Sequence, residues 1–508
     1  MMDDGKKIIV NTAAQYSRTF INTCLSLYTV RLVLNVLGQD DYGIYALVAS
    51  IVAMLGFLTN AMVVTTQRHL SYSYGKEGKE RVRQLFSNSV LMHIVISLLL
   101  VAVLFSIKGF IFSNYLQIAD DKRPEAMQVY LLSIVMLFVT FNNAPFKALY
   151  IARENIAFIS CVEVFDGFLK LGFAFLLSCV DAEKLPIYAL MMLAVQVVQF
   201  LAFSLFAIWK FEECSPRRFW RDSNRADMKL LAGFAGWTTY GTGSIVLRNQ
   251  GLAIVMNHYL GTAVNAAYGI SQQIYANLAF LSSSIVNAMN PQLMKAEGSG
   301  DRQRMLLLAQ KESKVILVIL SLVFIPLSVE MPNLLSIWLG SEQVNLYTVP
   351  LCQCMMFSLM IDQATYGLHA VMQAVGRIRN YTLLMYTPKI LLLFVMWGVF
   401  ENGYGIRGVL IAYMSVEALV ALMRIPYVKM AVGLNVGEYL RDTIVRVLPL
   451  MLLLAVVSWG MNQLSHHTLS FLWTIPTSVL LGVLFVWKGV LSKEEQEKLC
   501  EILKKKRR

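Results

Sequence analysis

Long apolar segments, each bounded by charged residues, glycine or proline, recur along the whole chain. A helix that crosses a membrane needs about 20 mainly apolar residues, and the segments approach or exceed that length. The pattern predicts about fourteen helical spans, at 10–37, 42–66, 86–107, 128–152, 156–180, 186–209, 229–258, 264–294, 313–331, 346–373, 381–400, 406–429, 444–463 and 469–488.

The composition narrows the class further. Of the 508 residues, 57% are hydrophobic and only 15% are charged, whereas soluble domains are about 45–50% apolar and about 25% charged. This balance excludes a soluble enzyme, a disordered scaffold and a disulfide-rich secreted domain. We therefore expect an all-α polytopic membrane protein. The seven scattered cysteines form no zinc-binding pattern, and no metal or cofactor is expected.

The basic residues predict an orientation. If both termini are cytoplasmic, most Lys and Arg residues fall in cytoplasmic segments, and the opposite side carries only Lys108, Lys122, Arg123, Lys184 and Arg407. Such a bias is typical of membrane proteins. It explains the net charge of +12 without nucleic acid as a partner.

An internal repeat divides the chain. Leu37-Gly38 recurs as Leu260-Gly261, and GKERVRQL at 78–85 recurs as GDRQRMLL at 300–307. Both copies start on the same side, so they predict parallel lobes with a site at their interface. The expected domains are an N-terminal lobe, a cytoplasmic linker, a C-terminal lobe, an extra span pair and a basic cytoplasmic tail, at 1–209, 210–228, 229–429, 430–490 and 491–508.

The first span carries a polar stripe on one helical face, formed by Asn11, Gln15, Arg18, Asn22, Ser26 and Thr29. Arg18 could snorkel towards the nearby inner edge. A snorkelling residue needs no polar companions, however, so the stripe favours a water-filled cavity.

In the seventh span, Arg248 occupies the face equivalent to that of Arg18, two turns deeper. Ser244 continues this face, and Trp237 lies beneath it. Arginines from both lobes would form a cationic chamber suited to phosphate oxygens, which arginine binds bidentately.

The eighth span carries a neutral polar stripe that includes Gln273, Asn277 and Asn287. These side chains suit sugar hydroxyls, but hydrogen bonds between helices explain them equally well.

Charged residues within other spans allow two interpretations. Glu163, Asp166 and Lys170 share one face of the fifth span, and Asp166 matches Lys389 in the repeat. Neutralisation of buried charges is one interpretation and ion or proton coupling is the other. Both also apply to Asp362 and Glu417. For Lys147, near the inner edge, snorkelling is favoured.

Two segments resemble a known family: RLVLNVLGQDDYGIYALVASI at 31–51 and FKALYIARENIAFIS at 146–160. They are similar to the polysaccharide transporters, the O-antigen or lipid-linked oligosaccharide flippases of the multidrug/oligosaccharidyl-lipid/polysaccharide exporter superfamily. The resemblance implies a bacterial inner-membrane protein, not an enzyme, with a V-shaped cavity and alternating access. It also implies an undecaprenyl-pyrophosphate-linked oligosaccharide as substrate, moved from the inner to the outer leaflet.

The resemblance assigns roles to the candidate residues. Arg18 and Arg248 would hold the pyrophosphate, and the glycan would contact Gln15, Asn22, Trp237, Ser244, Gln273, Asn277 and Asn287. Expected partners are a polysaccharide polymerase, a chain-length regulator and, at the basic tail, anionic lipid. We expect a monomer. A cation-coupled multidrug or small-molecule exporter and a membrane-embedded glycan polymerase or ligase are the alternatives.

Overall fold

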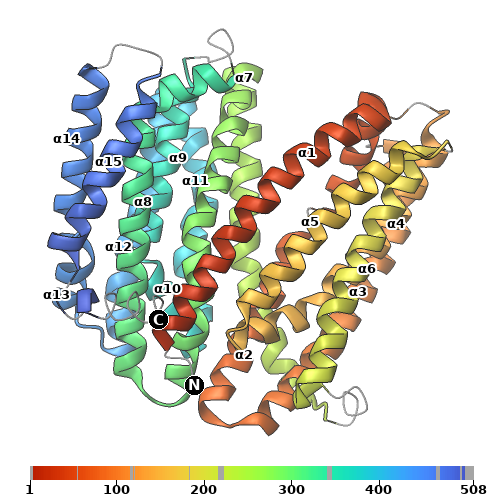
Figure 1. The fold of residues 1–508 in the computed structure, drawn as a ribbon, viewed down its shortest axis with the longest axis horizontal. Helices are drawn as coiled ribbons and strands as arrows, with labels where there is room; N and C mark the ends of the chain where they lie inside the picture. The colour runs from red at the N-terminus through yellow and green to blue at the C-terminus, as the bar shows by residue number, and fades with distance from the viewer. Residues whose placement is uncertain are drawn as a thin grey trace, which may run out of the picture. The chain divides into compact units, whose positions relative to one another are not determined.

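A computed structural model describes residues 4–53, 55–114, 118, 120–181, 183–214, 222–339, 346–464, 469–491, 493 and 495–497. The described residues are overwhelmingly helical and include no strand, which confirms the all-α expectation (Figure 1). The expected tail at 491–508 and the middle of the expected linker lie almost entirely outside the described residues.

The chain packs as two compact units, one comprising Asp3–Gly243 and Gly298–Gly300 and the other Ser244–Glu297 and Asp301–Arg508. The first unit contains α1 (Asp4–Ala53), α2 (Gly56–Lys76), α3 (Lys79–Asn114), α4 (Arg123–Ala152), α5 (Ile156–Ser178), α6 (Lys184–Lys210), the 3-10 turn η1 (Glu212–Cys214) and the start of α7 (Arg225–Gly298). The second contains the rest of α7, α8 (Arg302–Leu339), α9 (Thr348–Gln363), α10 (Tyr366–Val375), α11 (Ile378–Glu401), α12 (Gly405–Val432), α13 (Val436–Tyr439), the π-helical turn η4 (Leu440–Val445), α14 (Leu448–Leu464), α15 (Phe471–Phe485) and a second π-helical turn, η5 (Val486–Val490).

Among the described residues, nine helices are long and apolar enough to cross a membrane. Every predicted span overlaps a described helix, but those at 42–66, 156–180, 229–258, 264–294 and 346–373 are not among the nine. Helix α7 covers both predicted spans, at 229–258 and 264–294, but the chain reverses between them. The Tyr268 hydroxyl donates to the Asn249 carbonyl oxygen at 3.2 Å, whereas 19 residues of straight helix would separate the two positions by about 28 Å. The predicted break at 258–264 lies between these two residues, as expected.

The backbone supports the internal repeat. Gly78 and Gly300, 222 positions apart, both have positive φ angles, 79° and 80°, at the turns that precede α3 and α8. Glu154 and Gly376 are separated by the same number of positions and are also left-handed. Helices α5 and α11 begin at the same separation. The repeat therefore extends from sequence motifs to the turns that connect the helices.

Charged contacts fix the segment after α6 to the first unit. The Arg153 guanidinium and the Tyr74 hydroxyl both donate to Glu213, and Arg81 makes two hydrogen bonds to Asp227 at the start of α7. Burial by itself would raise the pKa of Glu213, but hydrogen bonds from its own backbone, Arg153 and Tyr74 outweigh burial and lower it. Glu213 is therefore ionised near neutral pH and holds the segment in place.

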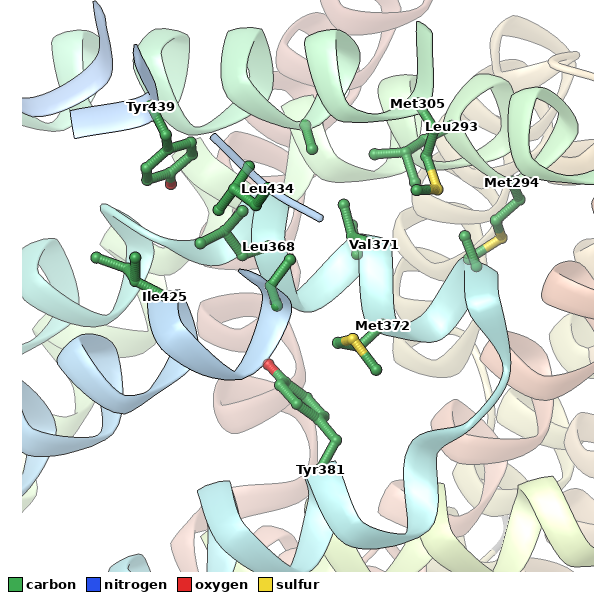
Figure 2. Packing of buried hydrophobic residues seen from close by; sticks show 14 of the residues in the cluster. Leu293, Met294, Met305, Leu368, Val371, Met372, Tyr381, Ile425, Leu434 and Tyr439 are labelled. Atoms are coloured by element: carbon green, nitrogen blue, oxygen red, sulfur yellow. The ribbon is translucent and has the colours of Figure 1, made fainter. Parts of the chain in front are cut away.

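In the second unit, α14 and α15 lie side by side against α8 (Figure 1). Polar contacts reinforce this packing, because the buried carboxylate of Glu330 on α8 accepts hydrogen bonds from Asn462 and Ser470. A separate apolar cluster joins α7, α8, α10, α11, α12 and α13, and Figure 2 shows Met305, Leu368, Val371, Tyr381 and Ile425 meeting in it.

Candidate functional site

The polar stripe of α1 faces α5 within the first unit. Asn11 donates to the carbonyl oxygen of Glu154 (2.9 Å), and Asn22 donates to that of Glu163 (3.1 Å). Arg18 forms an ion pair with the Glu163 carboxylate. The helices can approach because Gly167 has no side chain; a Cβ there would lie 2.7 Å from Asn22 Oδ1. The stripe thus serves helix packing, a role that neither sequence interpretation of Arg18 included.

Glu163 is the centre of a small charged cluster. Its second oxygen accepts from Lys147 Nζ at 2.7 Å, so the residue for which snorkelling was expected is paired instead. The side chains of Arg18 and Glu163 are 18% and 17% exposed, and that of Lys147 is 38% exposed. The N-terminal cluster, defined as Arg18, Lys147 and Glu163, therefore has two cations, one acid and access to solvent.

Asp166 forms an ion pair with Lys170 on the next turn of α5, at 2.7 Å. Its suggested partner by repeat position, Lys389, belongs to the second unit and binds acids there. Charge neutralisation, one of the two interpretations for these residues, is therefore present at both positions, with different partners.

The second unit contains a continuous buried chain of five charged side chains. Arg248 pairs with Glu417, which also accepts from Lys389 Nζ at 2.7 Å. Lys389 reaches Asp362 at 3.3 Å, and Asp362 accepts from Arg424 at 3.0 Å. None of the five side chains is more than 15% exposed. This C-terminal network has three cations and two acids.

Backbone breaks and an aromatic ring position the network. Arg424 also donates to the Asp362 carbonyl oxygen (2.9 Å) and the Thr365 hydroxyl (3.0 Å), where α9 ends and α10 begins. The guanidinium carbon of Arg248 lies 5.0 Å from the centroid of the Tyr413 ring, a cation–π distance. Arg424 is absent from the sequence-based candidates, although its spacing of seven from Glu417 places both on one face of α12.

The expected glycan contacts have varied surroundings. Gln15 and Ser244 are buried, Asn22, Trp237 and Asn287 are half-buried, and Gln273 and Asn277 are exposed. Trp237 packs near Tyr240, with 6.2 Å between ring centroids. Their binding of a glycan stays a prediction, as does a shared anion site for Arg18 and Arg248, which lie in different units.

Two further buried acids are absent from the sequence-based candidates. Glu330 is satisfied by neutral donors, including Asn333 at 2.9 Å. Glu312 is fully buried, and neither of its carboxylate oxygens has a hydrogen-bond partner among the described residues. The residues that the structure describes include no group of three or more His, Cys, Asp or Glu side chains that could hold a metal ion.

Two solved structures that resemble this chain are transporters. An outward-facing multidrug resistance transporter of the MATE family, in the MOP superfamily, has a TM-score of 0.73 at 14% identity, over 86% of this chain and 97% of that chain. The chain has the MATE transporter fold. A MOP superfamily transporter from Pyrococcus furiosus, reported for the reversed polarity of its binding pocket, has a TM-score of 0.70 at 14% identity, over 85% and 96%. No protein-family model and no curated protein matches the chain.

Proposed function

We propose that the protein moves an undecaprenyl-pyrophosphate-linked oligosaccharide from the inner to the outer leaflet of a bacterial membrane by alternating access. The MATE-like fold supports a transporter, and the segments at 31–51 and 146–160 support the polysaccharide branch of the superfamily. Arg18 and Arg248 bind the pyrophosphate in this proposal, and polar side chains along the cavity contact the sugars.

One observation favours an anionic substrate: counted over the described residues, each charged cluster has one more cation than acids. Two cations face one acid in the N-terminal cluster, and three face two in the C-terminal network. Uncompensated charge in a membrane protein is costly and marks substrate pathways. A pyrophosphate would supply the missing negative charge, and the arginine fork suits its oxygens.

A cation-coupled multidrug exporter is the second candidate. The structural likeness to a multidrug resistance transporter favours it. The acids of the two clusters, Glu163, Asp362 and Glu417, also favour it, because carboxylates can bind a coupling cation. The two functions predict opposite effects when the charge of the N-terminal cluster is changed.

Arg18→Ala should weaken binding of undecaprenyl pyrophosphate about ten- to hundredfold, because a hydrogen bond to a charged group contributes about 1.5–3 kcal/mol. Arg18→Lys keeps the charge without the fork and should retain part of the affinity. Glu163→Gln should leave binding intact or tighter, since it removes the competing carboxylate. Affinity measured on the purified protein checks all three.

Arg31→Ala is the matched control, since Arg31 is exposed on the same helix, and it should bind like the wild type. Arg18→Ala should still fold, because Glu163 keeps Lys147 as its partner. Unchanged pyrophosphate affinity in Arg18→Ala, together with loss of organic-cation binding in Glu163→Gln, would overturn the proposal in favour of the multidrug exporter.

A further inference from the structure

Glu312 differs from the acids that the sequence singled out. Glu163, Asp362 and Glu417 each contact at least one cation. Glu312 on α8 is 0% exposed, and both of its carboxylate oxygens lack a hydrogen bond in the described structure. Its neighbour Lys314 pairs with Glu495 instead (2.8 Å). Among the described residues, Glu312 is therefore a buried ionisable group with no countercharge.

The position of Glu312 is at a tight joint between α8 and α10. The hydroxyl of Ser313 accepts from the backbone N–H of Gly367 (3.0 Å) and lies 3.0 Å from the Tyr439 hydroxyl. A Cβ on Gly367 would collide with the carbonyl oxygen of Ala309. This joint directly follows the break between α9 and α10, so relative movement of these helices would change the water access of Glu312.

In the described part of the chain, the ionisable groups that face Glu312 are two phenols, Tyr366 from α10 and Tyr439 from α13. Arg424, on α12, is held by Asp362 and Thr365. The other described elements that pack on α8, namely α9, α14, α15 and η4, place no ionisable side chain within ion-pair or hydrogen-bond distance of the Glu312 carboxyl.

An ionised carboxylate without a partner is very costly to bury, whereas its neutral acid form costs far less. We propose that Glu312 is a proton-binding site that is occupied while α8 and α10 are in this contact. The carboxylate takes the proton from hydronium, forming one O–H bond and leaving one water molecule. When the joint opens to water the reverse step releases the proton, so the transport cycle carries protons. The coupling rests on the proposed transport function, but the occupancy of the site does not.

Infrared spectroscopy of the purified full chain in lipid nanodiscs tests the occupancy. A protonated carboxyl has a C=O stretch distinct from that of a carboxylate and sensitive to exchange into D2O. The wild type near neutral pH should show this band, Glu312→Gln should lose it, and Glu312→Asp should shift it. Glu438→Gln, at an exposed acid, should leave it unchanged. A wild type without the band, or a band that survives in both Glu312 variants, would overturn the proton site.

Proteoliposomes separate the coupling from the proposed function. With lipid-linked oligosaccharide as the probe, an imposed pH gradient should change the wild-type transport rate and leave Glu312→Gln unaffected. Equal rates with and without the gradient in both proteins would overturn the coupling. If the wild type shows the infrared band but moves no lipid-linked oligosaccharide, the proposed function fails while the proton site stands.

Discussion

Glu417→Gln is expected to lower the free energy of unfolding by about 3–5 kcal/mol, the usual cost of removing one partner from a buried ion pair. Arg248 and Lys389 both contact the Glu417 carboxylate, and the side chains of all three are less than 10% exposed. Replacing that carboxylate with an amide leaves two buried cations with too little negative charge. Thermal unfolding of the purified protein, read as loss of monodispersity, measures the change.

Asp362, the second acid of the network, determines which cation loses its partner in Glu417→Gln. Lys389 keeps Asp362 after the change, but Arg248 has no other acid within ion-pair distance among the described residues. The double variant Glu417→Gln/Arg248→Gln should therefore recover much of the lost stability. Glu401→Gln, an exposed acid on α11, should unfold like the wild type. A stable Glu417→Gln protein, or a double variant less stable than either single one, would contradict the network.

Gly367→Ala should destabilise the second unit by at least about 1–3 kcal/mol, the usual cost of forcing an extra methyl group into a packed site. The new Cβ would collide with the Ala309 carbonyl oxygen and lie 2.7 Å from Ser313 Oγ. Neither can yield easily, because one is helix backbone and the other bonds to Gly367 and Tyr439. Protein abundance in membranes and thermal unfolding report the effect.

Gly398 provides the comparison for this substitution. It is exposed on α11, and no atom lies within 4 Å of the position of a Cβ. Gly398→Ala should be neutral or stabilise the helix by up to about 1 kcal/mol, from helix propensity alone. If Gly367→Ala behaved like Gly398→Ala, the close contact between α8 and α10 would be wrong.

The helices and the repeat could be predicted because both are encoded locally. Hydrophobic length gives the spans, and motifs such as those at 78–85 and 300–307 mark equivalent turns, where Gly78 and Gly300 share one backbone conformation. The reversal between the two predicted spans of α7 could also be predicted, because Leu260-Gly261 repeats the Leu37-Gly38 motif at that place.

The partners of the charged residues depend on tertiary packing, which sequence spacing does not encode. Arg18 and Glu163 are 145 positions apart, and Arg248 and Glu417 are 169 apart. The repeat gives no guide here, since Glu163 corresponds to Met385 at the 222-residue separation. The lobes thus share helices and turns but not the partner of Arg18, and Glu312 became a candidate only through its burial without a hydrogen-bond partner among the described residues.

The most direct test of the central claim is the lipid-linked glycan pool of a bacterium that lacks this protein. The account predicts that one undecaprenyl-pyrophosphate-linked oligosaccharide accumulates in the inner leaflet and that surface glycan is lost. The intact gene should reverse both changes, whereas Arg18→Ala at equal protein level should not. Unchanged lipid-linked pools and normal surface glycan in the deletion strain would contradict the account.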